Sequence, residues 1–418
     1  MRHNRQPRRG TVAVLAALCV TGILGFAALS LDAALLHQDR RAAQAAADAA
    51  ALAAAGNLFA NWRANQGLDP AGAAANEALA AAAANGFAND GVHSTVTVNI
   101  PPQSGDHVGQ AGYVEVIVLQ FQQRAFSAIW GSDPVPVRAR AVARGLWVPV
   151  NNGIIVLDPT SSGSLTSNGG SSVTTNAKVI VDSNSPSATV VTGGGVLTAP
   201  EFDITGVPGT STSGGGVING TILDGQVPTP DPLAYLPEPD PSTMTKQSNK
   251  TVKLQNQGSL SLQPGVYQGG IQVTGGNLTL APGIYYMDGG GFSFSGTGSL
   301  SALGVLIVNA PQSNSDTVSI TGSGTINLSP PTTGIYQGIS LWQIRASTNT
   351  LTVAGGGSGS VTGTFYAQHG TLKTSGSGGS SVGSQYISWN VVLSGNGNFS
   401  ILWSPTAVAP AKLLQLVE

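Results

Sequence analysis

An uninterrupted apolar segment near the N-terminus constrains the fold of this chain more than any other feature. Residues 11–31 read TVAVLAALCVTGILGFAALSL and include no Asp, Glu, Lys, Arg or His. As an α-helix this segment is about 31 Å long, which matches the hydrocarbon thickness of a bilayer. We therefore predict one transmembrane helix at 11–31. Cys19, the only cysteine of the chain, lies inside it and is expected to pack as a small apolar side chain.

The charges on either side of the segment predict its orientation. Arginines precede it, whereas Asp32 and Asp39 follow it before the next arginine. Because cytoplasmic flanks are enriched in Lys and Arg, residues 1–10 are predicted to stay in the cytoplasm as a basic tip, with the bulk of the chain periplasmic or extracellular. The topology determinants are Arg2, Arg5, Arg8 and Arg9. A signal peptide cleaved after Ser30 is the alternative, but the segment is longer than the about 7–15 apolar residues of such peptides.

An alanine-rich stretch follows the apolar segment. Residues 32–56 contain no proline and no glycine before Gly56, and alanine is the best helix former. The transmembrane helix is therefore predicted to continue as one rod, a stalk that ends at Gly56. One stripe of the stalk carries residues spaced by three, four and four: Arg41, Gln44, Asp48 and Leu52. This stripe either faces solvent or forms a packing face for a partner helix, and the sequence leaves both readings open.

This N-terminal pattern resembles a known family. Arg9-Gly10, one apolar span, Asp32 and the run RAAQAAADAAAL at 41–52 are similar to the N-terminal domain of TadG-like proteins of Flp pilus-assembly (tight adherence) systems. The resemblance covers residues 8–56. It implies a protein of the bacterial inner (cytoplasmic) membrane that contacts other pilus-assembly or envelope proteins. Flp-type prepilins carry Glu at the fifth position after the processing glycine, whereas this chain has Leu15 there, so processing after Gly10 is not predicted.

Residues 57–146 are predicted to form a small α+β module outside the membrane. Asp69-Pro70 is expected to begin a helix that runs to Gly86, with Asp69 as its N-cap. Alternating apolar residues predict three strands of an antiparallel sheet, at 92–100, 113–121 and 134–143.

A short turn is expected between the second and third strands. Residues 125–131 predict one or two helical turns that end at Gly131. Phe126 and Trp130 lie in this turn, and we expect them to pack in the core of the thin sheet rather than to form a binding patch. The whole module resembles the segment that commonly follows the TadG-like anchor.

The remainder of the chain holds short alternating strands separated by Gly, Ser and Asn turns. The chain has 56 glycines in 418 residues, and 9% of its residues are charged. Pro264-Gly265-Val266-Tyr267 recurs 18 residues later as Pro282-Gly283-Ile284-Tyr285. Repeats of about 20 residues favour a β-solenoid, because stacked turns bury a column of apolar side chains that one turn cannot bury alone. We predict a mainly β chain with right-handed β-helix-like solenoid parts at 147–227 and 246–404; a β-sandwich is the alternative.

Residues 228–245 separate the two solenoid parts. This segment begins PTPDPLAYLPEPDP, and such proline density keeps a backbone extended, so we predict a linker or a strap lying across the solenoid. Its surroundings resemble, more loosely, the C-terminal extension of many TadG-like proteins, although the cysteines that such extensions often carry are absent here. Residues 405–418 are assigned only as a C-terminal tail.

Charge and motif content exclude several classes of protein. The net charge is −2 without a basic cluster that would hold phosphates, so no nucleic-acid partner is expected. No cofactor or metal is expected either, because the histidines are scattered and no phosphate-binding loop occurs. Between 251 and 404 the only carboxylates are Asp288 and Asp316, in ordinary turns about one and a half repeats apart, so they are not expected to converge as a catalytic pair. Catalytic, cofactor-binding and metal-binding residues are predicted as none.

The prediction is therefore a non-enzymatic, single-pass envelope protein whose partners are the lipid bilayer and other pilus-assembly or envelope proteins. Two alternatives are kept. A cell-surface adhesin would bind glycan or matrix through the solenoid, and carbohydrate binding by a 147–418 fragment would favour it. A polysaccharide-active β-helix enzyme would be favoured by reducing-end release that an Asp288→Asn variant lacks.

Overall fold

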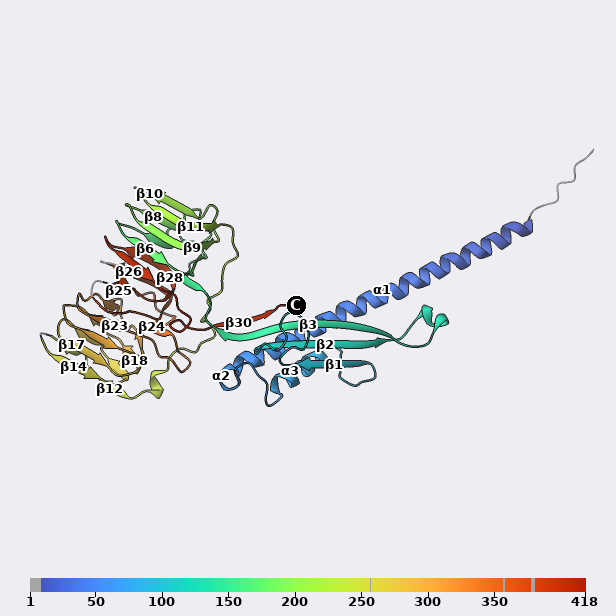
Figure 1. Cartoon of the computed structure of the whole chain (residues 1–418), viewed down its shortest axis with the longest axis horizontal. Helices are drawn as coiled ribbons and strands as arrows, with labels where there is room; N and C mark the ends of the chain where they lie inside the picture. The colour runs from blue at the N-terminus through green and yellow to red at the C-terminus, as the bar shows by residue number, and fades with distance from the viewer. Residues whose placement is uncertain (1–8, 256, 356–357, 377–379) are drawn as a thin grey trace, which may run out of the picture. The chain divides into compact units, whose positions relative to one another are not determined.

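The computed structural model describes residues 9–255, 257–355, 358–376 and 380–418 (Figure 1). They form two compact units. Unit 1 consists of the chain up to Val148 together with Lys412–Glu418, and unit 2 is Pro149–Ala411. Strands make up 40% of the structure and helices 18%, which confirms the prediction of a mainly β chain.

Unit 1 combines a long helix with an antiparallel sheet (Figure 1). Its helices are α1 Arg9–Ala60, α2 Trp62–Asn65 and α3 Ala73–Ala84, and a 3-10 turn, η1, covers Phe126–Trp130. Its strands, in sheet order, are β1 Ser94–Asn99, β2 Tyr113–Gln122, β3 Val135–Val148 and β30 Ala411–Leu416. The three strands expected from the alternation are β1, β2 and β3. The C-terminal segment, which the sequence left as a tail, supplies the fourth strand.

Helix α1 is one continuous rod from Arg9 to Ala60. The expectation that the stalk ends at Gly56 is wrong, because α1 continues for another four residues. Leu58 in this last turn is 1% exposed and belongs to the core of unit 1, so its burial offsets the low helix propensity of Gly56.

Helix α3 begins later than the sequence predicted. It starts at Ala73 with Gly72 as the N-cap, not at Pro70. Asp69 nevertheless serves the same helix end, since its Oδ2 accepts a hydrogen bond from the Ala75 N–H at 2.9 Å. The capping chemistry was therefore predicted correctly and its position in the chain was not.

Unit 2 is a β-solenoid of about 11 turns, which confirms the solenoid and not the sandwich. All of its strand pairs are parallel among the described residues. Strands before the strap are β4 Asn152–Val156, β5 Leu165–Ser167, β6 Ser172–Thr175, β7 Lys178–Val181, β8 Thr189–Thr192, β9 Val196–Ile204, β10 Thr210–Ser213 and β11 Val217–Leu223. A 3-10 turn, η2 Pro241–Thr243, precedes β12 Lys246–Ser248, β13 Val252–Leu254, β14 Ser259–Leu262, β15 Gly265–Gln268, β16 Ile271–Val273, β17 Asn277–Leu280, β18 Gly283–Asp288, β19 Phe292–Phe294 and β20 Leu300–Ala302. The last strands are β21 Val305–Ala310, β22 Val318–Ile320, β23 Ile326–Leu328, β24 Ile339–Gln343, β25 Leu351–Gly355, β26 Thr364–Gly376, β27 Ser380–Ser381, β28 Gln385–Ser394 and β29 Asn398–Ile401.

The turns of the solenoid do not follow one another in chain order. β4, β5 and β6 pair with β28 and β29 on one side and with β7, β8 and β9 on the other. The stack therefore begins at β12, rises through β28, continues through β4 and ends at β10 and β11 (Figure 1). The N-terminal part of unit 2, from β4 to β11, therefore forms one end of the stack, and the C-terminal part, from β12 to β29, forms the other end.

This order requires the chain after β11 to return along the whole stack. About 11 turns are separated by about ten spacings of roughly 4.8 Å, or about 48 Å. Residues 224–245 could reach roughly 70 Å if fully extended, so they can cover this length although they include η2 and a turn after Asp231. Solenoid side chains donate hydrogen bonds to backbone carbonyl groups of the returning segment and hold it against the solenoid. Tyr336 Oη donates to the Pro237 carbonyl at 3.1 Å, and Arg345 Nη2 donates to the Leu233 carbonyl at 3.0 Å. The proline-rich segment is thus a strap.

The spacing of the sequence repeat that predicted the solenoid differs from the spacing of the paired strand residues. Tyr267 and Tyr285 recur 18 residues apart, but Gly265 lies opposite Tyr285, a separation of 20 residues. A shift of two residues keeps a side chain on the same face of a strand. Both tyrosines consequently point into the core, with ring centroids 5.8 Å apart.

Candidate functional site

The first half of α1 is apolar and exposed. Leu18 is 67% exposed and Phe26 is 76% exposed, and the neighbouring Val, Ile and Leu side chains are exposed as well. An exposed apolar surface of this size is typical of a membrane-spanning or protein-binding segment. The length and composition of α1 allow it to cross a membrane. Cys19, which was expected to pack as a small apolar side chain, is exposed on the same half of α1.

The second half of α1 packs into unit 1 through alanine. Its buried residues are Ala43, Ala46, Ala47, Ala50, Ala51, Ala54, Ala55 and Leu58. They meet α3 and the face of the sheet formed by Val114, Val116, Val118, Ala139, Ala141 and Ala143. Because these side chains are small, the backbones come very close: a Cβ placed on Gly145 of β3 would lie 1.8 Å from the Ala55 carbonyl oxygen. The alanine content that predicted a helix also sets how closely that helix packs.

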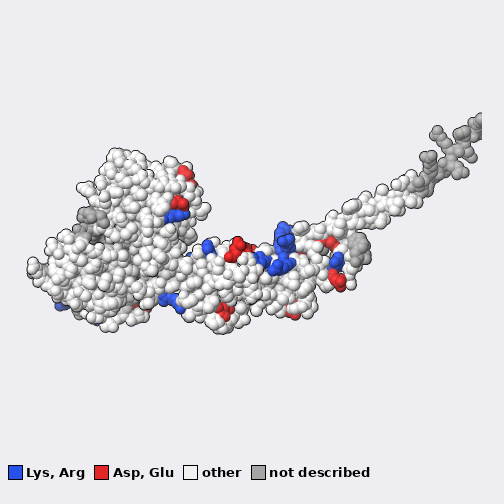
Figure 2. All heavy atoms as spheres, viewed as in Figure 1, with Lys and Arg blue, Asp and Glu red and all other residues white. Residues whose placement is uncertain are grey.

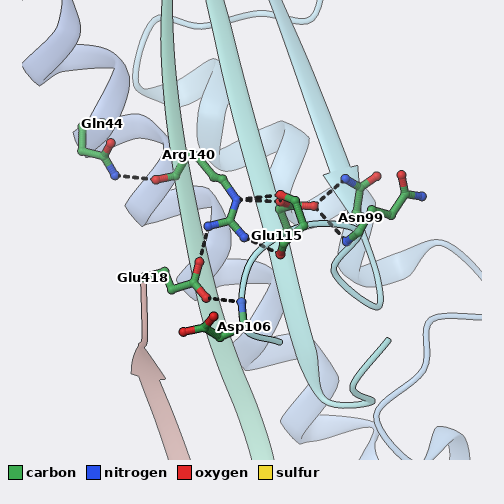
Figure 3. Close-up of polar contacts among 8 residues, drawn as sticks. Gln44, Asn99, Asp106, Glu115, Arg140 and Glu418 are labelled. Atoms are coloured by element: carbon green, nitrogen blue, oxygen red, sulfur yellow. Dashed lines mark hydrogen bonds and ion pairs between the residues drawn. The ribbon is translucent and has the colours of Figure 1, made fainter. Parts of the chain in front are cut away.

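The predicted stripe lies at the border of this packing face. The Gln44 side-chain amide donates to Asp48 Oδ1 at 2.8 Å. It also donates to the Arg140 carbonyl oxygen of β3 at 2.9 Å (Figure 3). Asp48 and Leu52 are half-buried, whereas Arg41 is exposed. The stripe therefore joins the helix to the sheet at Gln44 and presents Arg41 to the outside.

The predicted topology determinants lie at the N-terminus of the chain. Arg2, Arg5 and Arg8 lie outside the described residues, and Arg9 begins α1.

A charged network stands on the opposite face of the sheet. Arg140 Nε lies 2.6 Å from Glu115 Oε1, and the Arg140 guanidinium also pairs with the Glu418 carboxylate (Figure 3). Arg140 Nη2 donates to the Ser104 carbonyl at 2.6 Å. Glu418 accepts a further hydrogen bond from the Asp106 N–H at 3.1 Å. The network ties the C-terminal residue of the chain to the middle of β2 and β3.

Glu115 is the buried member of this network, with a fully covered side chain. Its Oε2 accepts from Asn99 Nδ2 at 2.8 Å and from the Gln103 N–H at 3.0 Å, and Ser104 Oγ donates to Oε1. Burial alone would raise the pKa of Glu115, but the hydrogen bonds from Ser104, Arg140, Asn99 and Gln103 outweigh it and lower the pKa to about 2. A carboxylate held in this way stays ionised at neutral pH and stabilises structure rather than transferring protons. In the sequence, a single glutamate inside the apolar run YVEVIVLQF indicates that Glu115 needs a partner, but no sequence pattern identifies which residues those partners are.

The tip of the β2–β3 hairpin is fixed where the apolar half of α1 ends. Asp32 is buried, and its carboxylate accepts the N–H groups of Phe126 and Ser127 at 3.0 and 2.7 Å. The helical turn expected at 125–131 is η1. The expectation that Phe126 packs in the core is wrong, since it is 51% exposed; the side chain of Trp130 lies outside the described part of the chain. The backbone N–H of Phe126 donates to Asp32 at the start of η1, and the Phe126 ring stays outside the core.

Unit 2 brings together residues that the sequence treated as separate. The Gln312 side chain donates to Asp288 Oδ1 at 2.8 Å, and the Gln312 N–H donates to Asp316 Oδ2 at 2.9 Å. Neighbouring turns therefore place the two aspartates beside one glutamine, one at its side-chain amide and the other at its backbone N–H. Asp316 Oδ2 also accepts the Ser313 N–H at 2.9 Å, so this carboxylate closes a turn.

A second polar cluster lies under the strap. Tyr366 Oη donates to Asp231 Oδ2 at 2.7 Å and accepts from Arg345 Nε at 2.9 Å. Burial raises the pKa of Asp231 although Tyr366 and Arg345 oppose that shift. His369 Nδ1 lies 2.6 Å from the Arg345 carbonyl oxygen. The Tyr366–Asp231 hydrogen bond fastens the strap to the solenoid, whereas the Arg345–Tyr366 and His369–Arg345 contacts join solenoid residues to one another. In the described ranges no three His, Cys, Asp or Glu side chains gather as a metal site.

Comparison with curated proteins and with solved structures gave no match to this chain. A family model gave one, and it falls on the helix that carries the exposed apolar half and the packed alanine half. Residues 10–57, which lie within α1, match the family described as putative Flp pilus-assembly TadE/G-like.

Proposed function

We propose that this protein is a non-enzymatic, single-pass envelope protein that serves Flp pilus assembly from the bacterial inner membrane. Residues 1–10 lie in the cytoplasm, and the sheet of unit 1 and the solenoid of unit 2 lie outside it. One observation carries the proposal: the same TadE/G-like helix, α1, is exposed and apolar in its first half and fixed to a folded unit in its second half. The helix thereby couples the bilayer to unit 1.

Placing a charge in the apolar half tests the anchor. The Leu18→Arg variant is expected to insert less well by about 2.5–3.5 kcal/mol, because an arginine at the centre of a span costs that much. The measurement is the fraction of full-length protein that stays in carbonate-washed membranes. Ala60→Arg adds the same charge at the exposed end of α1 and is expected to behave like the native protein. Full membrane retention of Leu18→Arg contradicts the anchor.

The stripe Arg41, Gln44, Asp48 and Leu52 is proposed as the contact for a partner helix in pilus assembly. It lies at the border of the α1 packing face, so a partner helix placed there would also touch unit 1.

Replacing Asp48 by Leu tests this contact. The variant loses the hydrogen bond with Gln44 and is expected to fold while recovering fewer pilus-assembly proteins in a pull-down from native membranes. Asp224→Leu makes the same change at an exposed position of unit 2 and is the matched control. Undiminished recovery of every partner with Asp48→Leu assigns the stripe to solvent.

A further inference from the structure

Two hollows lie side by side where α1 leaves its apolar half. The first, of about 410 Å³, is lined by Ala33, Leu36, His37, Arg40, Val135, Pro136, Val137 and Arg138. The second, of about 450 Å³, is lined by His37, Arg40, Arg41 and Gln44. Because they share His37 and Arg40, they form one depression between α1 and the first residues of β3, which we name the exit groove.

The exit groove is basic. Arg40, Arg41 and Arg138 are exposed, and none of them makes an ion pair with a described residue. No carboxylate lines either hollow within the described part of the chain. Figure 2 shows Lys and Arg side chains gathered on this part of unit 1, next to the white, uncharged half of α1.

Two acids on the same part of α1 do not cancel this charge. The Asp32 carboxylate is already used by two N–H groups of η1. Asp39 is half-buried, with an Oδ2 that is covered and has no hydrogen-bond partner. Three arginines thus face the groove against two nearby carboxylates, Asp32 and Asp39, neither of which lines it.

The distance from the bilayer fits a lipid headgroup. Arg40 follows Leu31, the last residue of the uninterrupted apolar segment, by nine residues, or about 14 Å along the helix. The Cα–Cβ bonds of a helix tilt towards its N-terminus, which favours a reach of Arg40 and Arg41 back towards the membrane surface, where long cationic side chains meet the headgroups. Guanidinium groups bind phosphate oxygens in pairs. The Leu36, Val135 and Val137 side chains supply an apolar wall for the glycerol and the first acyl carbons.

We infer that the exit groove binds the phosphate of an anionic phospholipid in the leaflet from which α1 emerges. The inference rests on the proposed membrane anchor and adds a lipid-binding site to it. Such a site fixes the depth and rotation of the stalk and so presents the rest of unit 1 in one orientation to its partners.

Lipid selectivity of the full chain tests the site. The protein is reconstituted into phosphatidylcholine nanodiscs that contain a small fraction of spin-labelled phosphatidylglycerol or spin-labelled phosphatidylcholine, and the immobilised fraction gives the relative association constant. We expect a preference of about fivefold or more for phosphatidylglycerol at low salt, which declines as salt screens the charges. The Arg40→Gln, Arg41→Gln, Arg138→Gln triple variant is expected to lower it to about onefold.

The controls separate this site from general charge and from the anchor. Lys246→Gln, Lys250→Gln, Lys253→Gln removes three exposed charges of unit 2 and is expected to keep the preference. Equal association of both lipids with the native protein, or a preference that survives in the arginine variant, overturns the inference. Loss of an acidic protein partner with the arginine variant, without lipid preference in the native chain, assigns the groove to that partner instead. A native chain that does not enter the nanodiscs contradicts the anchor itself.

Discussion

Replacing Gly145 by alanine is expected to destabilise unit 1 by about 3 kcal/mol or more. The added Cβ would lie 1.8 Å from the Ala55 carbonyl oxygen and 2.6 Å from the Ala55 carbonyl carbon. These are backbone atoms of α1, so no side-chain rotation can relieve the collision, and the helix must move away from β3. Movement opens the alanine interface, whose small side chains cannot fill the gap.

Hydrogen exchange and chemical unfolding of the full chain in detergent measure this effect. The amides of β2 and β3 are expected to exchange faster in Gly145→Ala, while the solenoid strands of unit 2 exchange as in the native protein. Gly56→Ala is the matched control, because a Cβ at Gly56 meets no atom within 4 Å. That control is expected to be neutral or to gain about 0.5–1 kcal/mol from higher helix propensity. Equal stability of the two variants would show that α1 does not pack closely on β3.

Helix α1 was predictable because its evidence is local. An apolar run followed by alanine without proline specifies a long helix whatever the rest of the chain does. The helix end was not predictable, since Gly56 is a reasonable stop and only the burial of Leu58 in the folded unit overrides it. The exposure of Phe126 escaped prediction for a similar reason, because it depends on a hydrogen bond from its N–H to Asp32, 94 residues earlier.

The solenoid fold was predictable from the sequence, but the order in which its turns stack was not. The repeat of Pro264-Gly265-Val266-Tyr267 shows that turns stack, yet every turn has the same kind of strand edge above and below. Which turn follows which is decided by all pairings together, and β4 stacking on β28 joins residues more than 200 positions apart. The strap is the consequence of that order. The density of prolines indicated a linker or strap, but the path of this segment follows only from the stacking order of all the turns.

The Glu115 network was the part of the site with the least sequence signal. Arg140 and Glu418 are 278 residues apart, and β30 had no alternation strong enough to mark it as a strand of the sheet in unit 1. A lone charge in a strand of valines shows that some partner exists, because a buried carboxylate without donors is too costly. Its identity follows only from the sheet order, which sets β30 beside β3.

The Glu115→Gln variant is expected to lose about 3 kcal/mol of unit 1 stability at neutral pH. Glutamine fits the same space but carries an NH₂ group towards donors and leaves the Arg140 guanidinium without its buried counter-charge, and breaking a buried pair costs about 3–5 kcal/mol. Glu418→Gln removes the other carboxylate of the same arginine, but that side chain is 24% exposed, so its loss is expected to cost no more than a surface ion pair. The measurement is the unfolding free energy of each full-length variant, with the sheet amides followed by hydrogen exchange. Equal losses for the two variants would show that burial does not distinguish the carboxylates.

The pH dependence of the native protein provides the decisive comparison. The pKa of Glu115 is lowered from 4.5 to about 2 on folding, so the unfolded chain binds more protons in that range. The stability that Glu115 contributes is therefore complete above pH 4.5 and is lost as the pH falls from 4.5 towards about 2. The full loss is about 3 kcal/mol, since each pKa unit corresponds to about 1.4 kcal/mol. Glu115→Gln lacks this one carboxylate, so its unit 1 should lose less stability between pH 5 and pH 2 than the native unit does. Parallel pH profiles for the two proteins would mean that Glu115 is not the carboxylate that holds the sheet and the C-terminus together.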